Sequence, residues 1–365
     1  MKGWNEMKRI TVCSSKTYDV IVDEGVINNA GYYVKGITKG DKIAVISDSN
    51  VWPIYGNQLL CSLKNTGYDI ISYIIPAGEL SKNGSHYLEI LNFLAENQLT
   101  RKDSIIALGG GVVGDLAGFI AATYLRGIPY VQIPTSLLAM VDSSVGGKTA
   151  INLPSGKNLA GAFYHPALVL CDLQALKSLP EDIFLEGCAE IIKYSILFDE
   201  ELFNHLNQKG RFFDRGYVIP RCIELKRDVV ARDELDFAER QLLNLGHTLG
   251  HSIEANSNYT IPHGKAVAIG ISLITACSVA AGVCEEDLFS EIRGILTKFS
   301  LPTTTSYDVN SLAGAALRDK KRGNSALTFI LPHAIGKCAI HTYSIEELET
   351  FIKAGLCYAD HHISG

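Results

Sequence analysis

The sequence has no apolar run of about 20 residues, the length that a membrane-spanning helix requires. It has no CxxC pair, and its nine cysteines are scattered from Cys13 to Cys357. This distribution favours reduced thiols over a disulfide framework and disfavours a thiolate metal site. The first ten residues also lack the charged-then-apolar pattern of a signal peptide. We therefore expect a cytoplasmic protein with no membrane partner.

An excess of basic charge is missing as well. The formal net charge is -6, which argues against a nucleic-acid partner because nucleic-acid phosphates require a basic protein face. Any anionic ligand must then be met by locally clustered cations. The chain is 47% hydrophobic and 20% charged, which is a globular composition. Its 365 residues suggest about two domains, each able to bury a core of its own.

Two halves of the chain differ in their hydrophobic patterns. Short β-rich runs alternate with helical stretches in the first half, at residues 42–49, 68–76, 104–111, 130–134 and 168–173. This alternation predicts βαβ units around a mostly parallel sheet. After about Leu179 the strands stop, and amphipathic stretches predict helices at residues 181–197, 217–232, 241–256 and 263–281. We expect an α/β domain over residues 1–179 and an all-helical domain over residues 180–365.

A glycine-rich motif follows the strand that is predicted to begin at Ser104. Gly109, Gly111 and Gly114 have GxGxxG spacing and lead into a predicted helix. Glycines let the backbone approach a pyrophosphate, and the helix N-terminus attracts it. The acidic residue expected about 20 residues later, which binds a ribose in standard dehydrogenases, is missing because the chain reads YLRGIPY there. A nucleotide site and a tight strand-to-helix turn both remain open.

Histidines and a carboxylate form a candidate metal site in the second half. His247 and His251 are four residues apart and share one helix face, and His263 begins the next predicted helix. Glu190 and Lys193 lie three apart in an otherwise mainly apolar segment. Catalytic zinc takes three ligands from histidine and carboxylate side chains and keeps an open position. The other interpretation is ordinary helix histidines beside a structural ion pair.

Polar residues gather among small residues and glycines in a third motif, residues 134–166. It contains Asp142, Lys148, Asn152, Lys157 and Asn158. Lysines beside glycine turns suit a bound phosphate or carboxylate, because small neighbours leave room and backbone N–H groups add donors. A solvated loop with incidental lysines is the alternative.

These segments, with their order and spacing, resemble the 3-dehydroquinate synthase family of the sugar phosphate cyclase superfamily. The strings that carry the resemblance include PAGELSKN, GGGVVGDLAGF, PTSLLAMVDSSVGGKTAIN, LNLGHTLGHSIE and HGKAVAIG, and it covers nearly the whole chain. It implies a nucleotide-binding α/β domain, a helical domain, an active site in the cleft between them and a homodimer. It also implies a phosphate-eliminating carbon–oxygen lyase of the shikimate pathway, which leads to chorismate and the aromatic amino acids.

The implied substrate is 3-deoxy-D-arabino-heptulosonate 7-phosphate, and the implied products are 3-dehydroquinate and phosphate. The reaction would run through transient oxidation by NAD, phosphate elimination, reduction, ring opening and intramolecular aldol closure. Oxidising the C5 hydroxyl acidifies the neighbouring C6–H, which explains why a reaction with no net redox change uses NAD. Zn²⁺ is the implied metal, with Co²⁺ as the alternative.

The resemblance also assigns residues by position. The implied metal ligands are Glu190, His247 and His263, so His251 becomes a proton-handling or substrate-binding residue. The implied cofactor contacts are Asp48, Asn50, Glu79, Lys82, Gly110, Gly111, Asp115, Thr135, Ser136, Asp142, Lys148, Lys157 and Ser178. The implied catalytic and substrate contacts are Arg126, Asp142, Lys148, Asn158, Lys193, Lys226, Arg240, Asn244, His251 and Lys320, the last preferred over Lys321.

Departures from the family pattern are few. Lys265 stands where a glutamate is usual, and His165 stands where glutamine is common.

Three other functions stay open: a sister cyclase that makes 2-deoxy-scyllo-inosose or a valiolone, a metal-dependent polyol dehydrogenase, and a non-catalytic nucleotide or metal sensor. Product analysis separates the two cyclases, and stoichiometric NAD consumption would mark the dehydrogenase.

Overall fold

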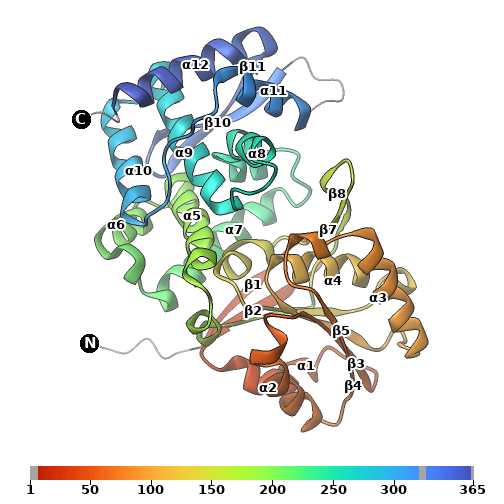
Figure 1. The fold of residues 1–365 in the computed structure, drawn as a ribbon. Helices are drawn as coiled ribbons and strands as arrows, with labels where there is room; N and C mark the ends of the chain where they lie inside the picture. The colour runs from red at the N-terminus through yellow and green to blue at the C-terminus, as the bar shows by residue number, and fades with distance from the viewer. Residues whose placement is uncertain (1–6, 320–325, 363–365) are drawn as a thin grey trace. The chain divides into compact units, whose positions relative to one another are not determined.

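The computed structural model describes residues 7–319 and 326–362. They form two compact units, which Figure 1 shows as ribbons. The first unit takes in the described residues up to Pro180 together with Arg215–Leu235. The second takes in Glu181–Asp214 and the described residues from Asp236 onward. The division into two continuous domains at residues 179 and 180 stays a prediction.

A seven-stranded sheet forms the centre of the first unit, in the order β1-β2-β9-β6-β5-β3-β4. All neighbouring pairs are parallel except β1 with β2, so the prediction of a mostly parallel sheet is confirmed. Every residue of β5, β6 and β9 is buried, which is typical of parallel strands covered on both faces. The strands are β1 (Lys8–Val12), β2 (Tyr18–Asp23), β3 (Lys42–Asp48), β4 (Asp69–Ile75), β5 (Ser104–Gly109), β6 (Tyr130–Pro134) and β9 (Leu168–Asp172).

Helices cover the two faces of this sheet with separate apolar cores. α1 (Ala30–Val34) and α2 (Trp52–Lys64) pack on one face. α3 (Gly84–Glu96) and α4 (Gly111–Thr123) pack on the other. The chain therefore leaves the neighbouring strands β3 and β5 toward opposite faces, because α2 follows β3 and α4 follows β5. Ligands of open α/β sheets bind beside the carboxyl ends of strands at such a point.

The third sequence motif folds into a turn and a hairpin on the first unit. A short π-helical turn, η4 (Ala139–Ser143), leads to the antiparallel strands β7 (Lys148–Leu153) and β8 (Gly156–Phe163). Strand β7 contacts α4, and helix α7 (Arg215–Arg232) contacts η4 and β1. The return segment therefore places α7 beside the motif, although the two are about 50 or more residues apart in the sequence.

Helices dominate the second unit, as predicted. α9 lies at its centre and contacts α5, α8, α10 and α12. By length and composition α9 is the one described helix that could cross a membrane, yet 78% of it is buried in this unit, as in a core helix. The helices are α5 (Glu181–Phe198), α6 (Glu200–Lys209), α8 (His247–Asn256), α9 (His263–Ala280), α10 (Glu286–Lys298), α11 (Val309–Asp319) and α12 (Ile345–His361).

Two details of the second unit differ from the sequence prediction. The all-helical prediction is wrong for β10 (Ala326–Ala334) and β11 (Lys337–Ser344), which form an antiparallel hairpin. The helix predicted over 241–256 is also broken, because α8 begins only after Gly246. Gly246 has φ +75°, and a Cβ there would lie 2.7 Å from the backbone nitrogen of Ile271. A glycine is therefore required at this position, and the helix cannot run through it.

Candidate functional site

Three potential metal ligands meet inside the second unit. Glu190 lies in the middle of α5 and is fully buried, His247 begins α8, and His263 begins α9. The Nε2 atoms of His247 and His263 lie 3.4 Å and 3.5 Å from Oε1 of Glu190. The potential ligand atoms of these three residues all lie within 4.8 Å of one another. Packing among three helices thus brings together residues that are far apart in sequence.

In both His247 and His263, the ring nitrogen that points away from Glu190 has a partner that fixes the orientation of the ring. Nδ1 of His247 lies 3.1 Å from the carbonyl oxygen of Leu245, and Nδ1 of His263 lies 3.4 Å from Oε2 of Glu254. In each case the acceptor assigns the ring proton to Nδ1. In the neutral form of each ring, which is the form that binds a metal, the lone pair is then on Nε2, which faces Glu190. Such outer contacts are typical of histidines that bind metals.

Electrostatics in this cluster favour a cation. Burial alone would raise the pKa of Glu190, but Lys193 and His247 hold it well below its usual range. Burial, together with the charge of Lys193, lowers the pKa of His247 to about 4, so its ring is neutral at pH 7. Burial also acts to lower the pKa of His263, but its interactions with the carboxylates of Glu190 and Glu254 overcome this effect and raise the pKa to about 10. The carboxylates therefore stabilise positive charge at this place.

A divalent metal fits the donor set. Oε1 of Glu190 is buried and has no hydrogen-bond partner among the described residues. Lys193, also buried, forms an ion pair with the other oxygen, Oε2. The carboxylate is thus held on one side, while its remaining oxygen faces the Nε2 atoms of two imidazoles. Two nitrogens and one carboxylate oxygen are ligands that zinc accepts in catalytic sites.

A second, overlapping ligand set lies beside the first. His251, Glu254 and His263 also bring potential ligand atoms within 4.8 Å of one another. The ring of His251 has its centroid 5.6 Å from that of His247 and 6.1 Å from that of His263. Geometry therefore allows two ligand sets that share His263. Sequence reasoning gave no role to Glu254, although its spacing of three and seven residues from the two histidines of α8 puts it on their helix face.

Several implied cofactor residues of the first unit lie at the carboxyl ends of β3 and β5, where the chain leaves the two neighbouring strands toward opposite faces of the sheet. Helix α4 begins at Gly111, and its N-cap Gly110 has extended backbone with no side-chain cap. A Cβ on Gly110 would lie 3.4 Å from Oγ of Ser136, so a larger residue would fill the space before the helix. An uncapped N-terminus with an open approach fits a pyrophosphate, because its backbone N–H groups point outward.

Other implied cofactor residues border the same sheet edge. Asp48 ends β3, and its Oδ1 accepts hydrogen bonds from the backbone nitrogens of Asn50 and Val51. Thr135 follows β6 and donates its backbone N–H to Gly109. Ser178 follows η5 (Leu173–Lys177), and its hydroxyl lies 2.5 Å from that of Tyr55. Their positions after β3, β6 and β9 match the edge at which α/β sheets bind ligands.

Lys82 links several implied residues into one network. It is buried, and its Nζ lies 2.6 Å from Oδ2 of Asp115 and 3.9 Å from Oε1 of Glu79. Burial raises the pKa of Asp115, although Lys82 opposes the shift. Asn152 donates to Glu79 and accepts a hydrogen bond from the backbone nitrogen of Asn158. The network therefore ties α4 to the β7–β8 hairpin.

Asp142 and Lys226 form the centre of the candidate anion site. Nζ of Lys226 donates to Oδ1 of Asp142 at 2.6 Å and to its carbonyl oxygen at 2.7 Å. Lys148 begins β7 next to this turn, whereas Lys157 lies in β8. Arg126 ends η3 (Tyr124–Arg126) in the left-handed region, with φ +67°. The structure thus joins Asp142 to Lys226 by direct contact.

The remaining implied substrate residues belong to the second unit. Arg240 and Asn244 lie in η7 (Glu239–Asn244), and Arg240 is only 2% exposed. Lys193 and His251 lie beside the candidate metal centre, as described above. Lys320 and its neighbour Lys321 fall outside the described residues.

Replacing Lys226 by methionine is expected to destabilise the protein by about 1.5 to 3 kcal/mol, the usual cost of losing a hydrogen bond to a charged group. The carboxylate of Asp142 would lose a charged donor, and its turn would lose a link to α7. Urea unfolding of Lys226→Met and Asp142→Asn, alone and combined, measures this effect. We expect the double variant to lose less than the sum of the single losses. Fully additive losses would contradict a direct coupling.

Solved structures with this fold include sugar phosphate cyclases. The structure of 2-deoxy-scyllo-inosose synthase with carbaglucose-6-phosphate, NAD⁺ and Co²⁺ has a TM-score of 0.86 at 24% identity, covering 96% of this chain and 100% of that one. The 2-epi-5-epi-valiolone synthase of Streptomyces hygroscopicus subsp. jinggangensis, with NAD⁺ and Zn²⁺ bound, has a TM-score of 0.85 at 24% identity, covering 97% of this chain and 100% of that one. The fold is therefore that of the cyclases.

Sequence comparison identifies the family within this class. The family description "3-dehydroquinate synthase N-terminal" matches residues 72–186, and "3-dehydroquinate synthase C-terminal" matches residues 187–322. A 3-dehydroquinate synthase of Streptococcus suis is 40% identical over 354 residues, covering 95% of this chain and all of that protein. One of Pelobacter propionicus is 43% identical over 342 residues, covering 92% and 95%. The chain belongs to the 3-dehydroquinate synthase family, which is a family of enzymes.

Proposed function

We propose that this enzyme converts 3-deoxy-D-arabino-heptulosonate 7-phosphate to 3-dehydroquinate and phosphate, with NAD and Zn²⁺ as cofactors and Co²⁺ as an alternative metal. The observation that carries the proposal is the cluster of Glu190, His247 and His263 in a chain of this family. The uncapped, glycine-headed N-terminus of α4 supports the cofactor. A protein that has both a metal to polarise an alcohol oxygen and a cofactor to accept a hydride suits a reaction that begins with oxidation of an alcohol.

The metal site is proposed to hold the substrate oxygen at which oxidation occurs. A bound zinc ion supplies a Lewis acid that polarises an alcohol or carbonyl oxygen. The chain's part is to fix the ligands: Lys193 holds one oxygen of Glu190, and Glu254 holds the outer nitrogen of His263. These contacts hold the ligand side chains in place for the metal.

The cofactor is proposed to lie on the carboxyl edge of the sheet. NAD supplies a hydride acceptor when bound, and the hydride can later return to the substrate. Gly110 and Gly111 would admit the pyrophosphate to the start of α4, while Asp48 and Asn50 border the site from the end of β3. Lys82 and Asp115 already satisfy one another, so we infer that they support this edge as a pair.

The substrate's phosphate and carboxylate require cations in a chain of net charge -6. We propose Arg126, Lys148, Lys226 and Arg240 for this role, with Lys193 and His251 handling protons. The hydrogen bonds from Lys226 hold Asp142 beside the turn that leads to Lys148. Cations gathered around the substrate would offset an overall acidic protein, as the sequence predicts.

Phosphate release from 3-deoxy-D-arabino-heptulosonate 7-phosphate, followed by identification of the organic product, tests the proposal. We expect 3-dehydroquinate, formed only when NAD is present or already bound. Release of phosphate from a different sugar phosphate, with a cyclitol as product, would instead identify a sister cyclase. No phosphate release from either substrate would contradict the proposed function.

We also propose that the enzyme is a cytoplasmic homodimer. The resemblance to the family supports the dimer, and the composition supports the compartment. Sedimentation equilibrium over a range of protein concentrations tests the oligomeric state, and a monomer at every concentration would contradict it.

Removal of Glu254 is expected to weaken metal binding by about 10- to 100-fold, the usual cost of losing an outer partner of a metal ligand. The variant Glu254→Ala frees the ring of His263 to rotate, because the carboxylate holds its Nδ1. Titration of the metal-free protein with Zn²⁺ and a competing chelator measures the affinity. Glu291→Ala, at an exposed position on α10, is the matched control. Equal affinities of the two variants would contradict this role.

A further inference from the structure

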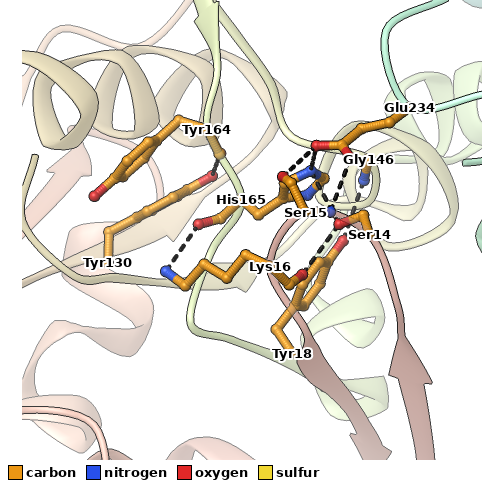
Figure 2. A network of polar contacts seen from close by, with 9 residues as sticks. All are labelled: Ser14, Ser15, Lys16, Tyr18, Tyr130, Gly146, Tyr164, His165 and Glu234. Carbon is orange, nitrogen blue, oxygen red and sulfur yellow. Dashed lines mark hydrogen bonds and ion pairs between the residues drawn. The ribbon is translucent and has the colours of Figure 1, made fainter. Parts of the chain in front are cut away.

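A buried histidine outside the metal site joins three distant segments of the first unit. His165 follows β8 and is 3% exposed. Its Nε2 lies 2.8 Å from Oε1 of Glu234 and 3.1 Å from Oγ of Ser14, as Figure 2 shows. Glu234 lies just beyond the end of α7, and Ser14 lies between β1 and β2. We refer to Ser14, Ser15, Lys16, His165 and Glu234 as the His165 clasp.

The hydrogen bonds of the His165 clasp determine where the ring proton lies. The hydroxyl of Ser14 donates to the carbonyl oxygen of Lys16 at 3.0 Å, so it can only accept from His165. Glu234 is an acceptor too, since the backbone nitrogen and hydroxyl of Ser15 donate to it at 2.8 Å and 2.5 Å. Burial raises the pKa of Glu234, but the bonds from Ser15 and His165 outweigh it and lower the pKa. Nε2 therefore carries the proton and donates it.

The other edge of the ring packs on a glycine turn. A Cβ on Gly147 would lie 2.9 Å from both Cε1 and Nδ1 of His165, and Gly147 has φ +71°. The same turn is held by its backbone: the nitrogen of Gly146 donates to the hydroxyl of Tyr18 at 3.1 Å. The carbonyl oxygen of Gly147 accepts from the backbone nitrogen of Tyr164 at 2.7 Å. The ring of His165 thus packs directly against the backbone of Gly147 in this turn.

Lys148, the next residue, leaves the turn to begin β7. The direction of its side chain depends on the backbone of Gly146 and Gly147, and glycines by themselves restrict that backbone little. The His165 clasp supplies the missing restriction, because Glu234 and Ser14 hold the ring over Gly147. Lys16 adds a bond from its Nζ to the carbonyl oxygen of His165 at 3.3 Å.

We propose that His165 is a positioning residue, which acts through the Gly146–Gly147 turn to aim Lys148 at the anionic group of the substrate. The proposal rests on the function proposed above for Lys148. It assigns His165 no contact with the substrate and no part in proton transfer. The family resemblance implies both a cofactor and a substrate contact for Lys148, and the function proposed above assigns it to the substrate. The clasp is therefore expected to serve turnover of the sugar phosphate without serving cofactor binding.

Two substitutions of His165 separate positioning from bulk packing. In His165→Ala the ring is absent, and we expect kcat/KM for the sugar phosphate to fall about 10- to 100-fold, as for a small misplacement of a catalytic group. In His165→Gln an amide N–H₂ group can still donate to Glu234, so most of the loss should be recovered. The affinity for NAD, measured by fluorescence titration, should stay within about twofold of the wild-type value in both variants. A loss of NAD affinity equal to the loss of turnover would overturn the proposal.

A double-mutant cycle tests whether His165 acts through Lys148. If it does, adding His165→Ala to Lys148→Ala should lower kcat/KM little further, because the group to be aimed is already gone. If the two losses simply multiply, His165 acts independently of Lys148 and the proposal is wrong.

Hydrogen exchange gives a readout that does not depend on the reaction. The amides of Gly146 and Tyr164 report on the turn, since the first donates from the turn to the hydroxyl of Tyr18 and the second donates to the carbonyl oxygen of Gly147. We expect them to exchange faster in His165→Ala and at nearly the wild-type rate in His165→Gln. His86→Ala, on α3, is the control and should leave both amides unchanged. Unchanged exchange in His165→Ala would overturn the proposal, whereas a wild-type enzyme that releases no phosphate would overturn only the proposed function.

Discussion

Chelation of the bound metal is expected to abolish phosphate release, and Glu190→Gln, His247→Ala and His263→Ala are each expected to purify with only background metal. Each change leaves two of three donors, and zinc needs at least three protein ligands to stay bound in a catalytic site. Elemental analysis of the purified variants measures the metal content. Glutamine is chosen at position 190 because its carbonyl oxygen can still accept a hydrogen bond from Lys193, whereas alanine would leave this buried ammonium group without a partner at that position.

The same measurement separates the two ligand sets that share His263. If Glu190, His247 and His263 bind the metal, His251→Ala should keep its metal and lose turnover. If His251, Glu254 and His263 bind it instead, His251→Ala should lose the metal while Glu190→Gln keeps it. The second result would show that the ligand assignment is wrong. NAD titration and thermal melting of each variant confirm that the chain remains folded.

The parallel sheet could be predicted because its strands are apolar on both faces. β5, β6 and β9 are buried at every residue, so each appears in the sequence as a short continuous apolar run between turns. The β10–β11 hairpin was missed, although it pairs over almost its full length. An amphipathic pattern shows that one face of α7 is buried but does not show against what. Its return to the first unit therefore had no sequence signal.

The candidate site was predicted in part by local spacing and in part by resemblance. Helical periodicity alone pairs His247 with His251, since they are four residues apart. The convergence of Glu190 with His247 and His263 depends instead on the packing of α5, α8 and α9, which no short-range pattern encodes. The bond between His165 and Glu234, 69 residues apart, is long-range in the same sense. The resemblance to the family marked His165 as a departure, because glutamine is common there, without indicating its partner.

The sister cyclases and the polyol dehydrogenase share this fold, so the fold does not separate them from the proposed function. Their chemistry differs, so experiments can. A metal beside an alcohol and a nucleotide on the sheet edge would serve all of them. Only the elimination of phosphate requires cations placed for a departing anion, such as those proposed around Asp142. The fate of the cofactor therefore distinguishes the cyclases from the dehydrogenase, and the organic product distinguishes the cyclases from one another.

We expect one enzyme-bound NAD to support many turnovers with no accumulation of NADH. Substrate and products of the proposed reaction have the same oxidation level overall, so the hydride removed from the C5 position must return within the same turnover. Exclusion of water protects the reactive ketone in the interval. The measurement is the ratio of phosphate released to NAD supplied, with absorbance at the NADH maximum followed in the same sample. Phosphate should greatly exceed NAD, and protein stripped of NAD should be inactive until NAD is restored. NADH formed one-to-one with product would contradict the cyclase reaction and identify a polyol dehydrogenase.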